Sequence, residues 1–281
     1  METRDLTVAV TNPDAPGPPP GGRPRRERRR ASLDRLAPWL RALLIVGVVG
    51  LLELVVGLGL INPLFVPKPS DALAELVGDA GEYARLLGTT LYETAVAFLG
   101  AAVIGSGLGY LLWRHRVLAA AVEPVLVGLF ASPIILLYPI FLIVLDRSVT
   151  AVIVQAMIGG IIPTVVTTQR ALHGVRATYL RAGYLYCRNR RQSFVNVLLP
   201  AAMPGIVSGL RLGLTYTLLT VLATEYLTNI GGIGAEISGA YTLLRTDRMY
   251  AALILVLVLT SAFLYGLDRL ERAFHAKGGQ G

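Results

Sequence analysis

The chain has 281 residues, of which 54% are apolar and only 16% are charged, and its formal net charge is +8. Soluble proteins are about 25% charged, so this balance, with a mean hydropathy of +0.60, argues against a soluble protein and predicts a membrane protein. The basic residues fall between apolar stretches, a pattern that favours membrane topology over binding to nucleic acid. The single cysteine, Cys187, excludes an internal disulfide.

The first 41 residues are predicted to form a disordered, basic, cytoplasmic tail. Residues 13–22 are rich in Pro and Gly and cannot build a core, and residues 23–30 are a block of like charge. Two interpretations stay open for this tail. It either contacts lipid headgroups or is a solvated segment that sets orientation, and the second is favoured. Its pattern is not that of a cleaved signal peptide.

Six stretches are long and apolar enough to span a membrane, which requires about 20 largely apolar residues. They are residues 42–61, 89–113, 124–145, 148–168, 195–224 and 249–267. The fifth is the weakest because Pro200, Pro204 and Arg211 interrupt it. We expect its first turns to lie at the cytoplasmic interface, after a turn around Leu199 and Pro200.

Lys and Arg are divided unequally between the two sides that six spans define. Twenty of the 26 fall on the side of both termini, five fall on the other side, and Arg211 lies within a span. Loops rich in Lys and Arg stay in the cytoplasm. Both termini and the loops 114–116 and 169–193 are therefore predicted to be cytoplasmic.

The first connection, residues 62–88, is predicted to lie outside. Three prolines between 62 and 70 indicate an extended segment. Ser70 is then the expected N-cap of a helix over 71–87, whose apolar residues Ala72 and Leu76 fall near one face. This pattern indicates a helix on the outer surface.

Glu53 lies in the middle of the first predicted span. An ionisable side chain within a membrane is a functional-site hypothesis by default. The other interpretation, a structural hydrogen bond to a neighbouring helix, is favoured, and both stay open.

The second to fourth spans carry residues that shape helix packing. The second contains Gly100, Gly105, Gly107 and Gly109, and small residues let helices approach closely in lipid. It ends at a tight turn, residues 114–116. The third has three prolines, which either kink the helix for packing or line a water-filled path. The fourth contains Pro163 and can also bend.

An arginine-rich segment, residues 176–193, separates the fourth and fifth spans. It has five arginines and no acidic residue. A charged side chain at the bilayer centre costs roughly 3 kcal/mol or more, so the segment is predicted to lie in cytoplasmic water. In that position it is a candidate binding segment through which a soluble partner moves the membrane helices.

Motifs for nucleotide binding or enzymatic chemistry are absent from the sequence. It contains no GxxxxGK[ST], HExxH, CxxC or GxSxG pattern. The glycines at 231, 232 and 234 are a turn signal without nucleotide-binding spacing. His115 has no other ligand type nearby and does not indicate a metal site. These absences predict a protein that is not an enzyme.

The segment around 181–200 resembles the cytoplasmic loop of ABC importer permeases, the inner-membrane components of binding-protein-dependent transport systems. The family pattern places Glu-Ala-Ala, then Gly, then Ile-x-Leu-Pro at fixed spacing. Ala182, Leu199 and Pro200 match it, and Gly183 and Val197 are conservative. Residues 66–70, 201–206 and 209–213 with Glu53, Glu225 and Gly232-Ile233-Gly234 also resemble the nitrate, sulfonate and taurine branch. The similarity covers residues 42–272.

Two positions depart from this pattern. Arg181 stands where the family has glutamate, and Cys187 where it has glycine. In the family this loop is a coupling helix that docks in a groove of the ATPase. Two interpretations of these departures stay open: co-adaptation with a dedicated ATPase, which is favoured, and degeneration in a subunit that pairs with a more regular partner.

The resemblance implies an all-α membrane protein with six transmembrane helices of the type I ABC importer permease kind and a cytoplasmic coupling helix. Its permease domain would cover 42–272, with coupling segment 176–193 and a cytoplasmic tail at 273–281. Expected partners are a second permease subunit, identical or different, a cytoplasmic ATPase dimer that binds ATP and Mg, an external solute-binding protein and membrane lipid, but no nucleic acid. The expected location is the bacterial inner membrane.

Two sets of site residues follow from this resemblance. The expected ATPase-coupling residues are Arg176, Arg181, Ala182, Gly183, Cys187, Arg190, Arg191, Leu199 and Pro200. The expected translocation path contains Glu53, Glu93, Ser132, Tyr138, Gln155 and Glu225. No catalytic residue, metal site or cofactor of the chain itself is expected. The expected mechanism is alternating access, with bending near the prolines of the third to fifth spans.

The expected solute is a small anion or organic acid, such as nitrate, a sulfonate or a carboxylate, or a pyrimidine-like precursor. The alternatives are a secondary carrier, a channel that is not coupled to an ATPase, and an assembly subunit that never contacts solute. A secondary carrier should show inverted repeats and paired charges within the membrane, and the sequence shows no evident repeat.

Overall fold

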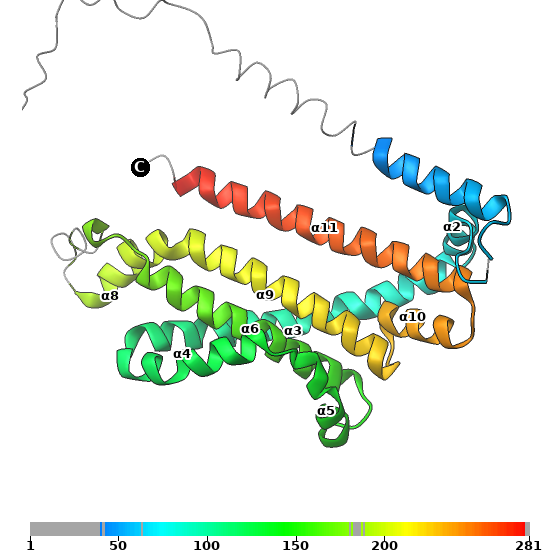
Figure 1. Cartoon of the computed structure of the whole chain (residues 1–281). Coiled ribbons are helices and arrows are strands. Elements are labelled where there is room, and N and C mark those ends of the chain that lie inside the picture. The colour runs from blue at the N-terminus through cyan, green and yellow to red at the C-terminus, as the bar shows by residue number, and fades with distance from the viewer. Residues whose placement is uncertain are drawn as a thin grey trace, which may run out of the picture. The chain divides into compact units, whose positions relative to one another are not determined.

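The computed structural model describes residues 40, 43–62, 64–179, 181, 187 and 189–278, with residues 190 and 270–278 described by their backbone alone. The chain divides into two units, residues 1–54 and 55–281. Every regular element in the described ranges is a helix (Figure 1). Apart from Leu40, the predicted N-terminal tail lies outside the described residues.

The predicted first span contains an apolar helix, Leu43–Gly57, that is shorter than expected. The chain leaves the helix at Leu58 and turns at Gly59, which has a φ of +73°. Such a φ is open to glycine at little cost. Glu53 belongs to the first unit and is half-buried in this helix.

Three long helices form the core of the second unit: α3 (Ala80–Arg114), α6 (Val149–His173) and α9 (Leu199–Thr228). Helix α6 packs along both α3 and α9. The small residues of α3 explain the first contact, because a Cβ at Gly105 would lie 2.7 Å from Thr164 Cβ and one at Gly109 would lie 2.8 Å from Thr168 Cβ. The predicted close packing is confirmed at these two glycines. Gly107 faces open space.

The predicted surface helix over 71–87 is wrong in both of its limits. Helix α2 (Pro69–Gly78) begins with Lys68 at the N-cap, and Pro69 takes the first turn, where its missing N–H costs nothing. It ends at Asp79, whose φ and ψ of −107° and 31° leave the helical region. Helix α3 starts directly afterwards at Ala80, so the second half of the predicted helix belongs to a span.

The third predicted span is broken rather than kinked. Helix α4 (Arg116–Ala131) follows α3 after the single residue His115, which confirms the predicted tight turn. It stops at Ser132, which is extended, because the residue before a proline disfavours the α region. A 3₁₀ turn (Ile134–Leu137) then leads into α5 (Tyr138–Val144). The two halves meet at 90°.

The predicted turn around Leu199 and Pro200 is wrong. A short helix α8 (Arg190–Ser193) leads into a π-helical turn (Phe194–Leu198), and α9 follows without a break. Pro200 lies in the first turn of α9, where it does not interrupt the hydrogen bonds. Pro204 lies inside α9 and is also accommodated.

Two further helices complete the second unit (Figure 1). Helix α10 (Gly232–Thr242) folds back against α9, α11 and α3, and the sequence analysis did not anticipate it. Helix α11 (Thr246–Gly278) packs against α2, α9 and α10. It extends beyond the predicted end of the sixth span, so part of the predicted C-terminal tail is helical.

The described residues thus contain fewer full spans than the six predicted. Four helices are long and apolar enough to cross a membrane, and the bent pair of α4 and α5 raises the number to five. The difference from six arises at Leu43–Gly57, which is too short in the described residues to count as a full span.

Candidate functional site

A cavity of about 340 Å³ lies beside the break between α4 and α5. Its wall combines the end of α4, the break itself, and facing residues of α6 and α9. Among the lining residues are Phe130, Ser132, Pro133, Gly159, Ile162, Tyr216 and Thr220. This volume is at the lower end of the range of small-molecule sites.

The cavity wall is mostly apolar, with a few hydroxyl groups. The rings of Phe130 and Tyr216 meet with their centroids 5.1 Å apart, joining α4 to α9. Thr220 lies one turn further along α9, and its hydroxyl donates to the Tyr216 carbonyl at 2.7 Å. Gly159 makes room for it, because a Cβ there would lie 2.7 Å from the Thr220 hydroxyl.

Gln155 holds the break in place from α6. Its side-chain amide donates to the carbonyl of Ile135 at 3.0 Å and lies 3.5 Å from that of Ile134. A broken helix frees backbone carbonyls, which need a partner inside a membrane. Gln155 is 1% exposed, so the break is supported by a buried side chain.

A buried carboxyl group joins α9 to the start of α10. Glu225 accepts a hydrogen bond from the Thr90 hydroxyl at 2.8 Å and another from the Gly234 amide at 2.8 Å. A Cβ at Gly232 would lie 2.0 Å from Glu225 Oε1. Gly232 and Gly234, two of the three glycines that the sequence marked as a turn, are therefore needed for close approach of this carboxylate. Glu93, on α3, is also fully buried and lies one helical turn after Thr90, the residue that donates to Glu225.

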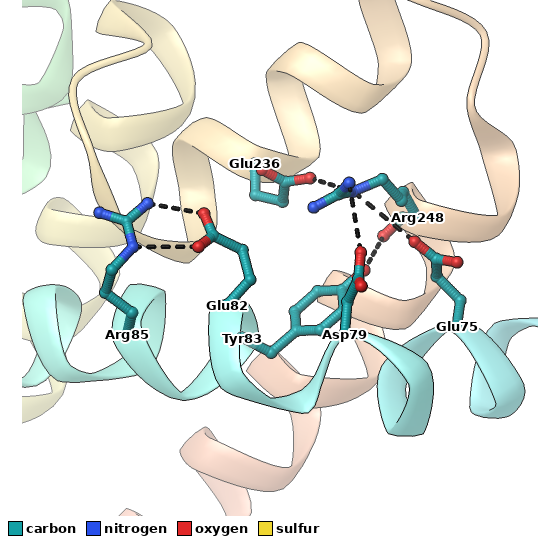
Figure 2. A network of polar contacts seen from close by, with 7 residues as sticks. All are labelled: Glu75, Asp79, Glu82, Tyr83, Arg85, Glu236 and Arg248. Carbon is teal, nitrogen blue, oxygen red and sulfur yellow. Dashed lines mark hydrogen bonds and ion pairs between the residues drawn. The ribbon is translucent and has the colours of Figure 1, made fainter.

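An ionic network links four helices at the end of the second unit where α2 and α10 lie (Figure 2). Arg248 Nε of α11 lies 2.7 Å from Glu236 Oε1 of α10 and 3.7 Å from Glu75 Oε1 of α2. Arg248 Nη1 lies 3.5 Å from Asp79 Oδ2. The Tyr83 hydroxyl of α3 donates to the Arg248 carbonyl at 3.4 Å. One guanidinium group thus fixes the start of α11 against α2 and α10.

The opposite end of the unit packs the π-helical turn onto α3 and α6. The Phe194 ring lies 5.0 Å from that of Tyr110 and 5.9 Å from that of Trp113. Leu198 packs in a cluster with Leu172 of α6. The π-helical turn before α9 is therefore in direct contact with these two helices.

The predicted coupling residues lie at this end, as far as the structure describes them. Arg176, Arg181, Arg191 and Pro200 are exposed, Cys187 and Leu199 are half-buried, and Arg190 begins α8. Ala182 and Gly183 lie outside the described residues.

A polar cavity of about 640 Å³ adjoins this end, between the start of α4 and the end of α6. Arg116, Glu123, Arg170 and His173 line it, and Arg170 lies 4.0 Å from Glu123. Within the described ranges, no group of three or more His, Cys, Asp or Glu side chains is arranged to hold a metal ion.

The residues predicted for the path fall into three places. Ser132 lines the cavity, Gln155 supports its break and Tyr138 begins α5. Glu93 and Glu225 come together in the buried pair, and Glu53 lies in the first unit. Sequence reasoning missed Phe130, Tyr216 and Thr220, because an aromatic or hydroxyl residue in a span is as typical of packing as of a path.

Comparison with known proteins identifies the family of this chain. The family model described as "Binding-protein-dependent transport system inner membrane component" matches residues 101–276. The chain is 26% identical to the aliphatic sulfonates transport permease protein SsuC of Bacillus subtilis, over 82% of this chain and 86% of that protein. It is 32% identical to the nitrate import permease protein NrtB of Synechocystis, over 59% and 61%. Identity to the taurine permease TauC of Escherichia coli is 25%, over 76% and 81%.

A solved structure supports the fold. The inward-facing MetNI methionine ABC transporter aligns with a TM-score of 0.61 at 21% identity, covering 68% of this chain and 95% of that chain. Members of the matched family are permease subunits, and a separate ATPase hydrolyses ATP for them. The chain belongs to the family of binding-protein-dependent transport system inner membrane components, and it is a membrane permease subunit of an ABC importer rather than an enzyme.

Proposed function

We propose that this permease carries its solute past the break between α4 and α5. The main support for this proposal is the cavity at that break, where a discontinuous helix faces α6 and α9. Irregular backbone at membrane depth is tolerated where it is buried in protein or lines a water-filled space. The aromatic pair and the hydroxyls of Ser132 and Thr220 offer contacts to a small solute.

The proposed solute is a small anion or organic acid, or a pyrimidine-like precursor. Relatives of this chain are permeases for aliphatic sulfonates, nitrate and taurine. These solutes differ in size and shape, so we assign recognition of the individual solute to an external binding protein. The permease needs only a path of suitable width.

The proposed assembly contains two permease subunits, a cytoplasmic ATPase dimer that binds ATP and Mg, and an external binding protein. The excess of Lys and Arg supports a cytoplasmic position for segment 176–193 and for both termini. The Arg248 network and α10 then lie on the outer side, where the binding protein would dock.

In the proposed mechanism, ATP-driven closure of the ATPases moves segment 176–193. The π-helical turn transmits this movement because Phe194 packs on Tyr110 and Trp113 of α3, and Leu198 packs with Leu172 of α6. A nearly complete shift between two conformations needs about 5 kcal/mol of differential binding. Nucleotide bound to the partner supplies it.

Thiol labelling tests the path. Ser132→Cys places a thiol in the cavity, and Ile143→Cys places one on α5 at a position that is 82% exposed and outside the cavity lining. Both variants are assembled with the ATPase and compared with the parent chain, whose single cysteine is Cys187. A water-soluble thiol reagent should label Ser132→Cys at a rate that changes when ATP is trapped, whereas labelling of Ile143→Cys should not change. A nucleotide-independent rate at position 132 would contradict the proposed path.

Deletion tests the coupling. Removing residues 176–193 should abolish co-purification with the ATPase while the chain still inserts in the membrane. Retained co-purification, or solute uptake into vesicles without ATP, would reject coupling through this segment.

A further inference from the structure

The buried pair of Glu93 and Glu225 is not used by the proposed path. Both side chains are 0% exposed. The two residues lie on different helices, α3 and α9, and both helices are long apolar spans. Carboxyl groups are costly at such positions unless they are paired or neutral. Their persistence here requires a compensating interaction.

Glu225 has hydrogen-bond donors for both of its oxygens. Thr90 donates to Oε1 and the Gly234 amide donates to Oε2, each at 2.8 Å. The Ile233 amide donates to the Thr90 hydroxyl at 3.0 Å, which fixes that hydroxyl toward Glu225. The Gly234 donor belongs to the first turn of α10, where the helix dipole favours an anion. This environment suits an ionised Glu225.

Glu93 has the opposite environment. Neither of its oxygens is reached by an N–H or O–H donor among the described residues. Thr90, one turn before Glu93 on α3, donates to Glu225, and Ala97, one turn after it, packs in a cluster with Val221 of α9. Glu93 therefore lies beside Glu225. An ionised carboxylate is only an acceptor. Two ionised groups could not form a hydrogen bond here and would repel each other without screening by water.

We propose that Glu93 and Glu225 hold one proton between them, bound on Glu93 and donated to ionised Glu225, and that this proton locks the start of α10 to α3 and α9. The shared proton is the ligand of this pair, and neither carboxyl belongs to the proposed solute path.

The described surroundings of the pair on α6, α10 and α11 include two apolar clusters. Toward α6 the pair is bordered by the apolar cluster of Ala97, Val152, Ala156 and Val221. Toward α10 and α11, Ile233 packs with Ala251 and Ala252. The charged residues Glu236 of α10 and Arg248 of α11 pair with each other in the separate ionic network. A proton is therefore the simplest cation that removes the repulsion between the two carboxyl groups.

Infrared spectroscopy of the full-length permease tests the proton directly. The wild-type protein at neutral pH should show the C=O band of a protonated carboxylic acid that is slow to shift in D₂O, because the group is buried. Glu93→Gln should remove this band. Absence of the band in the wild-type protein would overturn the proposal, whether or not any variant folds.

Two matched variants test the position of the proton. Glu93→Gln keeps a donor facing Glu225 and should leave the Tm at neutral pH nearly unchanged. Glu225→Gln turns an NH₂ group toward the donors of Thr90 or Gly234 and should lower the Tm clearly. Equal effects of the two substitutions, or a larger effect at position 93, would overturn the assignment to Glu93.

A pH series separates the proton from a metal cation. Raising the pH removes the shared proton and leaves two buried charges, so the wild-type protein should lose stability on the alkaline side, and Glu93→Gln should lose less. The series is repeated with Na⁺ and with a bulky organic cation. If Na⁺ raises the alkaline Tm of the wild-type protein but not that of Glu93→Gln, the site binds Na⁺ and the proton proposal fails.

Discussion

Arg211 of α9 and Asp268 of α11 form an ion pair, with Arg211 Nη2 2.5 Å from Asp268 Oδ1. The sequence shows Arg211 only as an interruption of an apolar span. The structure supplies its counter-charge from the other end of the chain, on a helix that packs alongside. The pair explains how a span with an arginine in it remains a helix in the membrane.

Removing one partner of this pair should destabilise the protein. Asp268→Asn leaves Arg211 without its counter-charge, and because both side chains are about one-third exposed or more, the cost should be only about 1 kcal/mol. The double variant Arg211→Leu with Asp268→Leu should recover most of the loss, since apolar replacements of an ion pair are often tolerated. Thermal unfolding of the purified protein measures both. A double variant less stable than Asp268→Asn would contradict the pairing.

The glycines of α3 should differ sharply in their tolerance of alanine. Gly105→Ala forces a methyl group against Thr164 and should cost about 1–3 kcal/mol, as overpacking does. Gly107→Ala enters open space on the same helix, and it should be neutral or slightly stabilising because alanine favours helix. Tm values of the two variants give the comparison. Similar losses at both positions would show that α3 and α6 do not meet as described.

Gln155 should matter more for transport than for insertion. Gln155→Leu leaves the Ile135 carbonyl without its donor at a cost of about 1–3 kcal/mol, and the break should lose its fixed geometry. ATP-driven uptake should fall further than the amount of protein in the membrane. The control is Ile153→Met, a half-buried position on the same helix, which should retain uptake. Full uptake by Gln155→Leu would argue against a role for the break.

Arg248 of the ionic network and the nearby Arg85, which pairs with Glu82 on α3, should differ in their effect on stability (Figure 2). Arg248→Met leaves three carboxylates without a cation, and with the Arg248 side chain only 16% exposed we expect a loss of about 1–2 kcal/mol. Arg85→Met breaks only the exposed pair with Glu82 and should change little. Unfolding at low and high salt measures both, and high salt should weaken the effect at position 248. Equal effects would mean that the network does not hold α11.

The sequence was sufficient for the fold class and for most spans. Apolar length located α3, α6, α9 and α11, and Arg114 to Arg116 marked the turn into α4. Element boundaries were less certain. The limit of α2 depends on Asp79 leaving the helical region, and the course of the chain at Leu199 depends on a π-helical turn, neither of which leaves a clear signal in residue type.

The third span shows why a proline pattern is not enough. Pro133 indicates some interruption, because it has no N–H and restricts Ser132. Whether the interruption is a slight kink or a 90° break depends on which residue donates hydrogen bonds to the freed backbone carbonyls. Here that residue is Gln155, about 20 positions away on another helix, and a single sequence does not connect the two.

The buried pair was visible only in part. Glu93 and Glu225 could be singled out as acidic residues in spans, but their meeting depends on how α3 and α9 pack. One local signal was present, since Thr90 lies three positions before Glu93 and so on the same face of a helix. The glycines at 232 and 234 gave the other signal, although their role is to admit a carboxylate rather than only to turn the chain.

The backbone contact between α3 and α6 limits which parts of the molecule can change shape during a cycle. Gly105 and Gly109 of α3 lie against Thr164 and Thr168 of α6. If α3 slid along α6, side chains of one helix would clash with the backbone of the other before a new register was reached. Helices α3 and α6 should therefore move together as one rigid body. The break at Ser132 and Pro133 is then the flexible hinge. An inhibitor that binds in this break should stop transport without separating α3 from α6.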